Sequence, residues 1–453
     1  MHPLALPIAK GCRYTLLISV FLLGSILTSL STAEQRWTIE SPDGELSIRI
    51  SLQAPQAVAG YPDDDVRLYD EVEHRGTRVV ELSPLGMIRD DHPFAGGMRF
   101  VSKSDIQSID EIYEMPHGKR KECRLRARQQ VLSFDQPDGD SMQLVILAAN
   151  DGVALRYVFP TESEVARSVV EELTGCRLPQ KSVAWMSPFQ LPSKYTPSYE
   201  DVYLDAIPVG TASPSRTGWA FPALFKTPQD RWVLFSEAAV DGAYCGTRLA
   251  ADAPHGVYRI ALPDPDEGAG TGTIYPQSKL PWTMPWRVLL VSDRLSDLVA
   301  STLINDLNPA SRIEDTAWIR PGRVAWSWWS DHDSPRSFEK QARFIDLAAE
   351  MGWEYYLVDA NWTLMDGGDV RQLTQYAKQK NVGILLWYNS GGEHNTVTEK
   401  PRGCMKLRDV RRFEFDLLRK WGVKGVKVDF FQSDKQNIMQ QYWDILQDAA
   451  DYQ

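Results

Sequence analysis

The sequence predicts a multidomain protein of β plus α/β class, in which a large β-sandwich precedes an incomplete (β/α)8 TIM barrel. Apolar and polar residues alternate in short runs from Trp37 to about Pro309, as is typical of antiparallel strands. Four strand-plus-helix units follow, as is typical of a parallel sheet with right-handed crossovers. The chain has 453 residues, more than one ordinary domain holds.

The start of the chain has the features of a signal peptide. Lys10 and Arg13 supply positive charge, residues 16–30 are apolar, and residues 31–33 are small, as at a cleavage site. The apolar run is too short for a stable membrane span. We therefore expect residues 1–33 to be removed and the protein to be secreted or periplasmic.

Composition limits the classes of partner. The formal net charge of −11 argues against nucleic acid and anionic membranes, which prefer basic surfaces. The 15 tryptophans either fill a large core or line a carbohydrate site, since indole packs on the CH groups of a sugar. Cys12 precedes the apolar leader core, which disfavours a lipoprotein. The other four cysteines lack CxxC spacing, which argues against zinc and leaves room for one disulfide in the first domain.

Residues 34–309 are expected to form the sandwich. Strictly alternating runs predict strands, and Asn150-Asp151-Gly152 predicts a hairpin turn between two of them. Residues 264–270 are rich in Pro, Asp and Gly and predict a surface loop. The alternating runs are residues 45–52, 65–69 and 143–147.

Residues 310–453 are expected to form the α/β region, after a linker helix over residues 295–303. The predicted strands are residues 323–329, 355–359, 383–388 and 425–430. Each is followed by a helical pattern; Ser337 and Asp369 are its expected N-caps in the first two helices. The expected inward faces are Phe338, Ala342, Ile345, Ala348 and Ala349; Val370, Leu373 and Ala377; Val410, Phe413, Leu417 and Trp421; and Ile438, Tyr442, Ile445 and Leu446.

Four such units fit either an open doubly wound sheet or half of a (β/α)8 barrel. A complete barrel needs about 250 residues, and only about 130 follow Pro321. We interpret the region as the first half of a barrel.

Polar residues follow each predicted strand, at the barrel end where chemistry is placed. Asp429 ends the fourth strand. One interpretation makes it a reactive carboxylate; the alternative is a structural role, as a cap of the next helix or a partner of Lys427. Four such clusters in register, with tryptophans among them, predict a sugar pocket. The clusters are residues 330–333; Asp359, Asn361 and Trp362; residues 389–395; and Lys427 with Asp429, and the tryptophans are Trp328, Trp329, Trp362 and Trp387.

Taken together, five motifs resemble glycoside hydrolase family 97. The resemblance runs from about Trp37 to the end of the chain. The motifs are NDGVALRY at 150–157, VAWSWW at 324–329, YLVD at 356–359, WYNSGG at 387–392 with His394-Asn395, and GVKVDF at 425–430.

The resemblance implies an exo-acting, calcium-dependent α-glycosidase with a mutarotase-like super-sandwich. In retaining members the nucleophile is the aspartate that ends the fourth strand, here Asp429. Inverting members use a glutamate base after the third strand, where Glu393 lies. The Gly-Gly-x-His-Asn context is that of retaining members, which implies an α-galactoside more than an α-glucoside.

A retaining mechanism needs two carboxyl groups about 5 Å apart. In the family the second is a glutamate later in the barrel, yet no glutamate follows Glu414 here. The alternative is therefore an inactive carbohydrate-binding fragment that lacks the acid/base glutamate. A mutarotase-like sandwich acting alone is disfavoured, because no His pair with a neighbouring acid is evident.

The resemblance also implies one calcium ligand from the sandwich. Glu200 is the expected ligand and Glu237 its competitor; an ordinary exposed glutamate is the alternative for both. Among the other candidates, Asp359, Trp362, His394 and Lys427 are expected to bind substrate; each also has a plain structural explanation. In these alternatives Lys427 only neutralises Asp429, Asp359 is a helix or loop cap, and His394 is solvated. The Trp run at 326–329 is expected to be mostly core, with one Trp at the pocket.

Overall fold

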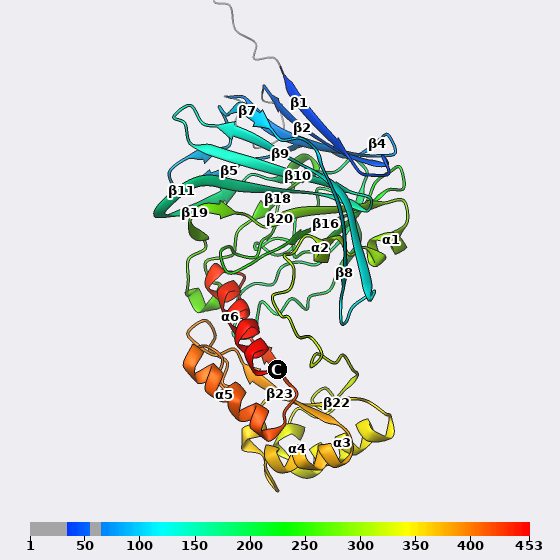
Figure 1. Cartoon of the computed structure of the whole chain (residues 1–453), viewed down its shortest axis with the longest axis vertical. Coiled ribbons are helices and arrows are strands. Elements are labelled where there is room, and N and C mark those ends of the chain that lie inside the picture. Colours follow the sequence, from blue (N-terminus) through cyan, green and yellow to red (C-terminus); the bar gives the residue numbers. More distant parts are fainter. Residues whose placement is uncertain (1–33, 55–64) are drawn as a thin grey trace, which may run out of the picture. The chain divides into compact units, whose positions relative to one another are not determined.

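The structure is a computed structural model that describes residues 34–54 and 65–453 (Figure 1). The predicted signal peptide lies outside the described residues. Within them, no helix combines the length and apolar character needed to cross a bilayer.

The first region consists of two antiparallel sheets, one of 7 and one of 13 strands. The smaller sheet has the order β1 (Gln35–Glu40), β2 (Leu46–Gln53), β3 (Arg67–His74), β4 (Thr77–Pro84), β12 (Gly175–Arg177), β18 (Val257–Ala261), β17 (Arg248–Leu249). The main path of the larger sheet is β14 (Leu204–Pro208), β13 (Val183–Met186), β15 (Ala223–Lys226), β16 (Trp232–Ala238), β20 (Trp286–Ser292), β11 (Gly152–Glu172), β10 (Ser141–Ala149), β9 (Glu122–Asp135), β7 (Arg99–Lys103). Four further strands pair off this path: β5 (Met87–Arg89), β6 (Pro93–Phe94), β8 (Gln107–Glu114) and β19 (Gln277–Thr283).

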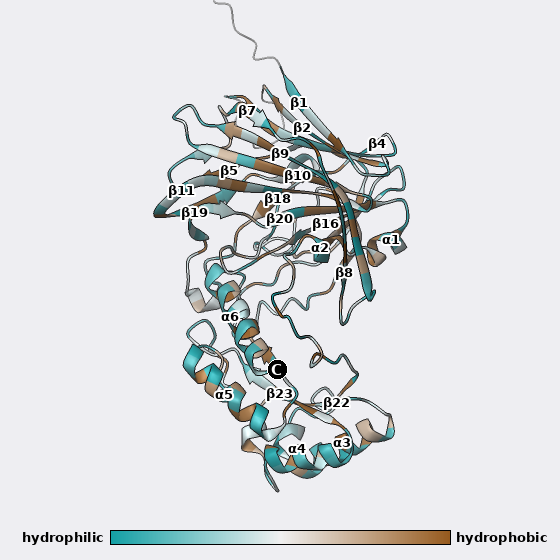
Figure 2. Ribbon diagram, viewed as in Figure 1, coloured by the Kyte–Doolittle hydropathy of each residue, from teal (hydrophilic) through white to brown (hydrophobic). Residues whose placement is uncertain are grey.

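The alternation of buried and exposed side chains along the strands allows the two sheets to pack face to face. Along β9, buried and exposed residues alternate, and Figure 2 shows the matching change between hydrophobic and hydrophilic residues. Side chains of both sheets, among them Ile48 and Phe235, join one buried core. The predicted hairpin is confirmed, since Ala149 of β10 lies opposite Gly152 of β11.

The predicted surface loop at residues 264–270 is confirmed in part. Pro265, Asp266, Ala269 and Gly270 are exposed, whereas Glu267, in a short 3-10 turn (Glu267–Gly270), is fully buried beside the Arg248 guanidinium. The turn-rich composition predicted the irregular backbone correctly, but it carried no signal for the buried pair of Glu267 with Arg248. No disulfide joins the four described cysteines, which are all free: Cys123, Cys176, Cys245 and Cys404.

The second region contains a parallel sheet in the order β21 (Val324–Trp326), β22 (Tyr355–Val358), β23 (Gly383–Asn389), β24 (Gly425–Asp429). The predicted α/β region is therefore confirmed, while the described sheet is open and has four strands. The first strand is shorter than predicted, because the chain turns from Ser327 onward. The linker helix is split into α1 (Leu295–Ala300) and α2 (Leu303–Asp306).

Four helices flank this sheet: α3 (Phe338–Glu350), α4 (Val370–Gln379), α5 (Arg408–Trp421) and α6 (Gln436–Tyr452) (Figure 1). The predicted caps are confirmed. Ser337 accepts a bond from the Lys340 amide, and Asp369 forms a capping box with Gln372. Gly422 ends α5 with φ of 82°, a left-handed conformation that favours glycine.

The predicted inward faces of α5 and α6 are partly wrong. Val410 and Phe413 are 41% and 68% exposed, and Leu446 is 62% exposed. The buried face of α5 instead carries Arg411, whose guanidinium donates to Asp448 of α6 at 2.5 and 2.8 Å. A helical pattern read from apolar residues alone misses a buried ion pair.

We predict that Asp448→Ala destabilises the protein by about 3–5 kcal/mol, because it leaves the Arg411 guanidinium buried without its carboxylate. Urea unfolding measures the loss. The matched control is Asp416→Ala on α5, the helix that carries Arg411; it removes the exposed i,i+4 pair with Lys420 and costs far less. Equal losses from the two variants would contradict the assignment.

Candidate active site

A cavity of about 1150 Å³ lies at the carboxyl ends of the parallel strands. One side of its wall comes from the strand ends of the four-stranded parallel sheet. The other comes from the sandwich segment of residues 195–200, which lies between β13 and β14. Residues about 230 positions apart in the sequence therefore share one cavity.

Asp429 stands at the end of β24, opposite Asn389 of β23. Its Oδ2 accepts a hydrogen bond from the Trp387 indole at 3.0 Å, and its Oδ1 accepts from the Phe430 amide at 2.8 Å. The side chain is 38% exposed and lines the cavity. The carboxylate is thus held by two donors while it still faces the cavity.

Lys427 points to the same side of β24 as Asp429, because side chains alternate along a strand. Its Nζ lies 3.1 Å from Asp359 Oδ2 and 3.7 Å from Asp429 Oδ2. The Trp326 indole also donates to Asp359 Oδ2, at 2.7 Å. The structure therefore brings three predicted site residues, Asp359, Lys427 and Asp429, into one network on the cavity wall.

Tryptophans form much of the same wall. Trp326, Trp328, Trp329 and Trp387 all line the cavity, and Trp329 is 78% exposed. The rings of Trp326 and Trp328 are stacked, 5.7 Å apart. The expectation that the run at 326–329 is mostly core is therefore wrong, because the chain leaves the sheet after Trp326.

Two predicted substrate-binding residues are not brought to this cavity. Trp362 is 7% exposed and donates its indole N–H to the Trp387 carbonyl at 2.8 Å, so it supports a wall residue from behind. His394 is 2% exposed, not solvated, and its Nε2 lies 2.8 Å from Ser390 Oγ. Ser390 Oγ in turn donates to the Phe430 carbonyl, next to Asp429.

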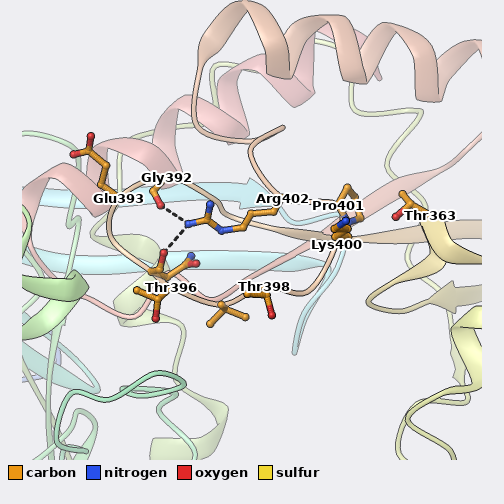
Figure 3. Close-up of a pocket in the computed structure, with 10 residues that line it drawn as sticks. Thr363, Gly392, Glu393, Thr396, Thr398, Lys400, Pro401 and Arg402 are labelled. Carbon is orange, nitrogen blue, oxygen red and sulfur yellow. Dashed lines mark hydrogen bonds between the residues drawn. The ribbon is translucent and has the colours of Figure 1, made fainter.

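Glu393, the glutamate considered as an inverting base, lines a different cavity of about 1000 Å³ (Figure 3). There, Arg402 donates to the carbonyls of Gly392 and Asn395, at 2.7 Å each, and ties the loop together. A second glutamate of this loop, Glu399, lines the cavity of Asp429 instead. Glu399 could not be distinguished from Glu393 in advance, because irregular loops have no periodicity from which to predict where a side chain points.

The two glutamates considered for calcium lie in different environments. Glu200 lines the cavity and makes no ion pair within the described parts of the chain. Glu237 is occupied: it pairs with Arg287 at 2.7 Å and accepts from Thr247. Glu237 is therefore set aside as a ligand.

Calcium takes six to eight oxygen ligands, more than one glutamate supplies. Over residues 34–54 and 65–453, one group of acidic and histidine side chains has metal-ligand spacing, namely Asp91, His92 and Asp140 in the sandwich. Arg89 and Arg167 already bind Asp91 there. Glu200 belongs to no such group among the described residues.

The aromatic residues of the sandwich segment were not predicted from the sequence. Tyr195 and Tyr199 line the cavity, and the Tyr195 ring lies 6.0 Å from that of Phe430. Nothing in a stretch rich in Ser, Pro and Tyr distinguishes a cavity wall from an exposed loop.

Two family profiles match the chain. "Glycosyl-hydrolase 97 N-terminal" matches residues 39–309, and "Glycoside hydrolase 97" matches residues 318–453. The chain belongs to glycoside hydrolase family 97. The resemblance inferred from the motifs is thereby confirmed.

Two named relatives, both retaining α-galactosidases, also match most of the chain. A "Probable retaining alpha-galactosidase" of Streptomyces bingchenggensis is 29% identical over 98% of this chain and 66% of its own length. A "Retaining alpha-galactosidase" of Bacteroides thetaiotaomicron is 26% identical over 92% of this chain and 63% of its own length. The family 97 chain thus spans slightly less than two thirds of these relatives.

Solved structures share the fold. The crystal structure of a beta-arabinopyranosidase has a TM-score of 0.84 and 32% identity, over 92% of this chain and 65% of that one. A family 97 enzyme from Pseudoalteromonas sp. strain K8 has a TM-score of 0.73 at 21% identity, over 92% and 65% of the two chains.

We predict a pH-dependent contribution from His394 to the stability of this family 97 chain. Burial, together with Lys406 and Arg402, lowers the pKa of His394 from 6.5 to about 4. Between pH 6.5 and pH 4, His394 is protonated in the unfolded chain and neutral in the native chain. Proton binding therefore favours the unfolded chain, and the native state loses stability as the pH falls through this range. His394→Gln should lose about 3 kcal/mol less than the parent between pH 7 and pH 4 in urea unfolding.

The control for this prediction is His255→Gln, at an exposed position of the sandwich. It should keep the pH dependence of the parent. A His394→Gln variant with the parent's pH dependence would contradict the assigned burial.

Proposed function

We propose that this chain carries the sugar cavity and the nucleophile of an exo-acting, retaining α-glycoside hydrolase, with Asp429 as the nucleophile. One observation carries the proposal: Asp429 ends β24, faces a cavity lined by tryptophans, and is held by donors that leave it open to that cavity. Similarity to two retaining α-galactosidases supports it.

The first chemical step follows from this position. A carboxylate oxygen of Asp429 attacks the anomeric carbon, a new C–O bond forms, and the bond to the leaving oxygen breaks. An acid must give that oxygen a proton and later activate water. As the resemblance to family 97 implies, we propose that this acid is a glutamate later in the barrel; in this sequence no glutamate follows Glu414.

Asp359 and Lys427 are proposed to bind sugar hydroxyls. Their 3.1 Å contact fixes a cation and a carboxylate side by side, a pairing that offers both a donor and an acceptor to a polyol. The substrate is proposed to be an α-galactoside or α-glucoside; the beta-arabinopyranosidase neighbour adds a pentopyranoside to the test panel. L-Arabinopyranose keeps the ring hydroxyls of galactose and lacks its exocyclic CH2OH.

We further propose that Glu200 is one calcium ligand. When bound, calcium supplies a positive charge beside the cavity that favours bound hydroxyl oxygens. We also propose that the protein is exported, to the periplasm or beyond.

We predict that a 5-fluoro-α-galactosyl fluoride labels this chain at Asp429. Fluoride leaves without a proton, so the first step needs no general acid, and the fluorine on the sugar slows release of the product. Intact mass followed by peptide mapping should place one glycosyl group on the peptide that contains Asp429.

The variants Asp429→Asn and Glu393→Gln separate the two carboxylates. The first should lose all labelling, and the second should label like the parent, because Glu393 lines the other cavity. Binding of galactose without any label would instead favour the inactive carbohydrate-binding fragment.

A further inference from the structure

The segment that follows Asp429, residues 430–435, is fastened to the sandwich. The Gln432 side-chain amide donates to the Lys194 carbonyl at 2.7 Å. The Lys435 ammonium is buried and donates to three carbonyls, those of Pro265, Glu267 and Thr271. The strand end that carries the proposed nucleophile is thus attached directly to sandwich loops.

Tyr199 meets this segment from the sandwich. Its φ is 61°, a left-handed conformation that is uncommon for a bulky residue and persists only where the surroundings hold it. Its hydroxyl donates to Asp434 Oδ1 at 2.8 Å, and the Phe189 ring contacts its ring edge-on at 5.7 Å. Asp434 therefore holds a strained residue that lines the cavity.

Asp434 occupies a crowded ionic site. Its amide donates to Glu267 Oε2 at 2.9 Å, and Arg248 Nη2 lies 2.5 Å from Glu267 Oε1 but 3.7 Å from Asp434 Oδ2. One guanidinium thus serves two buried carboxylates. Burial raises the pKa of Asp434 to about 6; Arg248 opposes this rise and Glu267 adds to it. The other ionisable groups that face Asp434 are Glu237, Cys245, Tyr199, Tyr442 and its chain neighbour Lys435.

A second carboxylate beside Arg248 costs free energy, because desolvation is repaid only by excellent geometry. Asp434 accepts one short bond, from Tyr199, and keeps a longer contact with the guanidinium. The buried Asp434 carboxylate is therefore better explained by the position in which it holds residues 195–200, against the end of β24, than by a gain in folding stability.

We infer that Asp434 is a positioning residue for the sugar cavity: by accepting the Tyr199 hydroxyl, it fixes the sandwich segment 195–200, with Glu200, against the strand end that carries Asp429. The inference rests on the proposed function for its consequence, the binding of sugar. The contact itself stands on the structure alone.

Tyr199→Phe and Asp434→Asn test it, singly and together, by hydrogen exchange of residues 190–203 normalised to an unstructured peptide. Tyr199→Phe should raise exchange about tenfold, as expected when a hydrogen bond to a charged group is lost. Asp434→Asn should raise it less, because an amide oxygen still accepts without charge. The double variant should match Tyr199→Phe, because both changes act on the same hydrogen bond and Tyr199→Phe already removes it.

Galactose affinity, measured by calorimetry, should fall in Tyr199→Phe in step with the exchange. The matched control is Tyr113→Phe, which removes another tyrosine–carboxylate bond, to Asp306, within the sandwich. It should change neither exchange at 190–203 nor affinity, even if its melting temperature drops.

Unchanged exchange in Tyr199→Phe, or additive effects in the double variant, would overturn the inference. If Tyr199→Phe does not fold, Asp434→Asn and Tyr113→Phe decide it alone. A parent that binds neither galactose nor glucose nor arabinose but shows the exchange pattern would refute the proposed function and leave the positioning contact standing.

Discussion

The parallel register of four strands is the constraint on which the site depends. Trp387 lies opposite Lys427, and Asn389 lies opposite Asp429, so one position on β23 fixes its partner on β24. Since side chains alternate, Lys427 and Asp429 lie on one side of β24 and line the cavity, while Val426 and Val428 lie on the other side and pack against the apolar core; Val428 also contributes to the cavity lining. A slip of one residue would turn the Asp429 side chain toward the apolar core.

The same arrangement of strands gives Asp359 and Asp429 different environments and therefore different roles. Lys427 Nζ is nearer to Asp359 than to Asp429, and its ammonium lies 4.5 Å from the centre of the Trp326 ring. Asp359 is 4% exposed and receives both the lysine and an indole N–H. Asp429 receives an indole and an amide and is 38% exposed. The more buried carboxylate is saturated with donors, and the more open one retains access to a ligand.

Much of this arrangement was predictable from the sequence, because it follows from periodicity. Short apolar runs located β22 to β24, and the end of each run located Asp359 and Asp429 at one edge. Capping residues such as Asp369 gave helix starts. These signals are local, and the local pattern and the fold agree there.

The rest depended on contacts between distant residues. Trp362 and His394 follow strands as expected, yet their neighbours turn them inward, toward Trp387 and Ser390. Arg411 and Glu267 are buried only because Asp448 and Arg248 meet them from elsewhere in the chain. No composition rule distinguishes a buried charge with a partner from an exposed one without.

The composition of the cavity wall narrows what it can hold. Its acidic residues come from both regions of the chain, and Lys427 is the one lysine or arginine among the described residues that line it. An anionic ligand would meet repulsion from carboxylates that a single ammonium, already bound to Asp359, does not offset. A neutral ring meets donors, acceptors and indole faces instead, as carbohydrate binding requires. The acidic members of this wall are Glu200, Asp333, Asp359, Glu399 and Asp429. The same charges that argue for a neutral sugar would also attract a cation, because a cleft lined by charges of one sign raises the local concentration of the opposite sign.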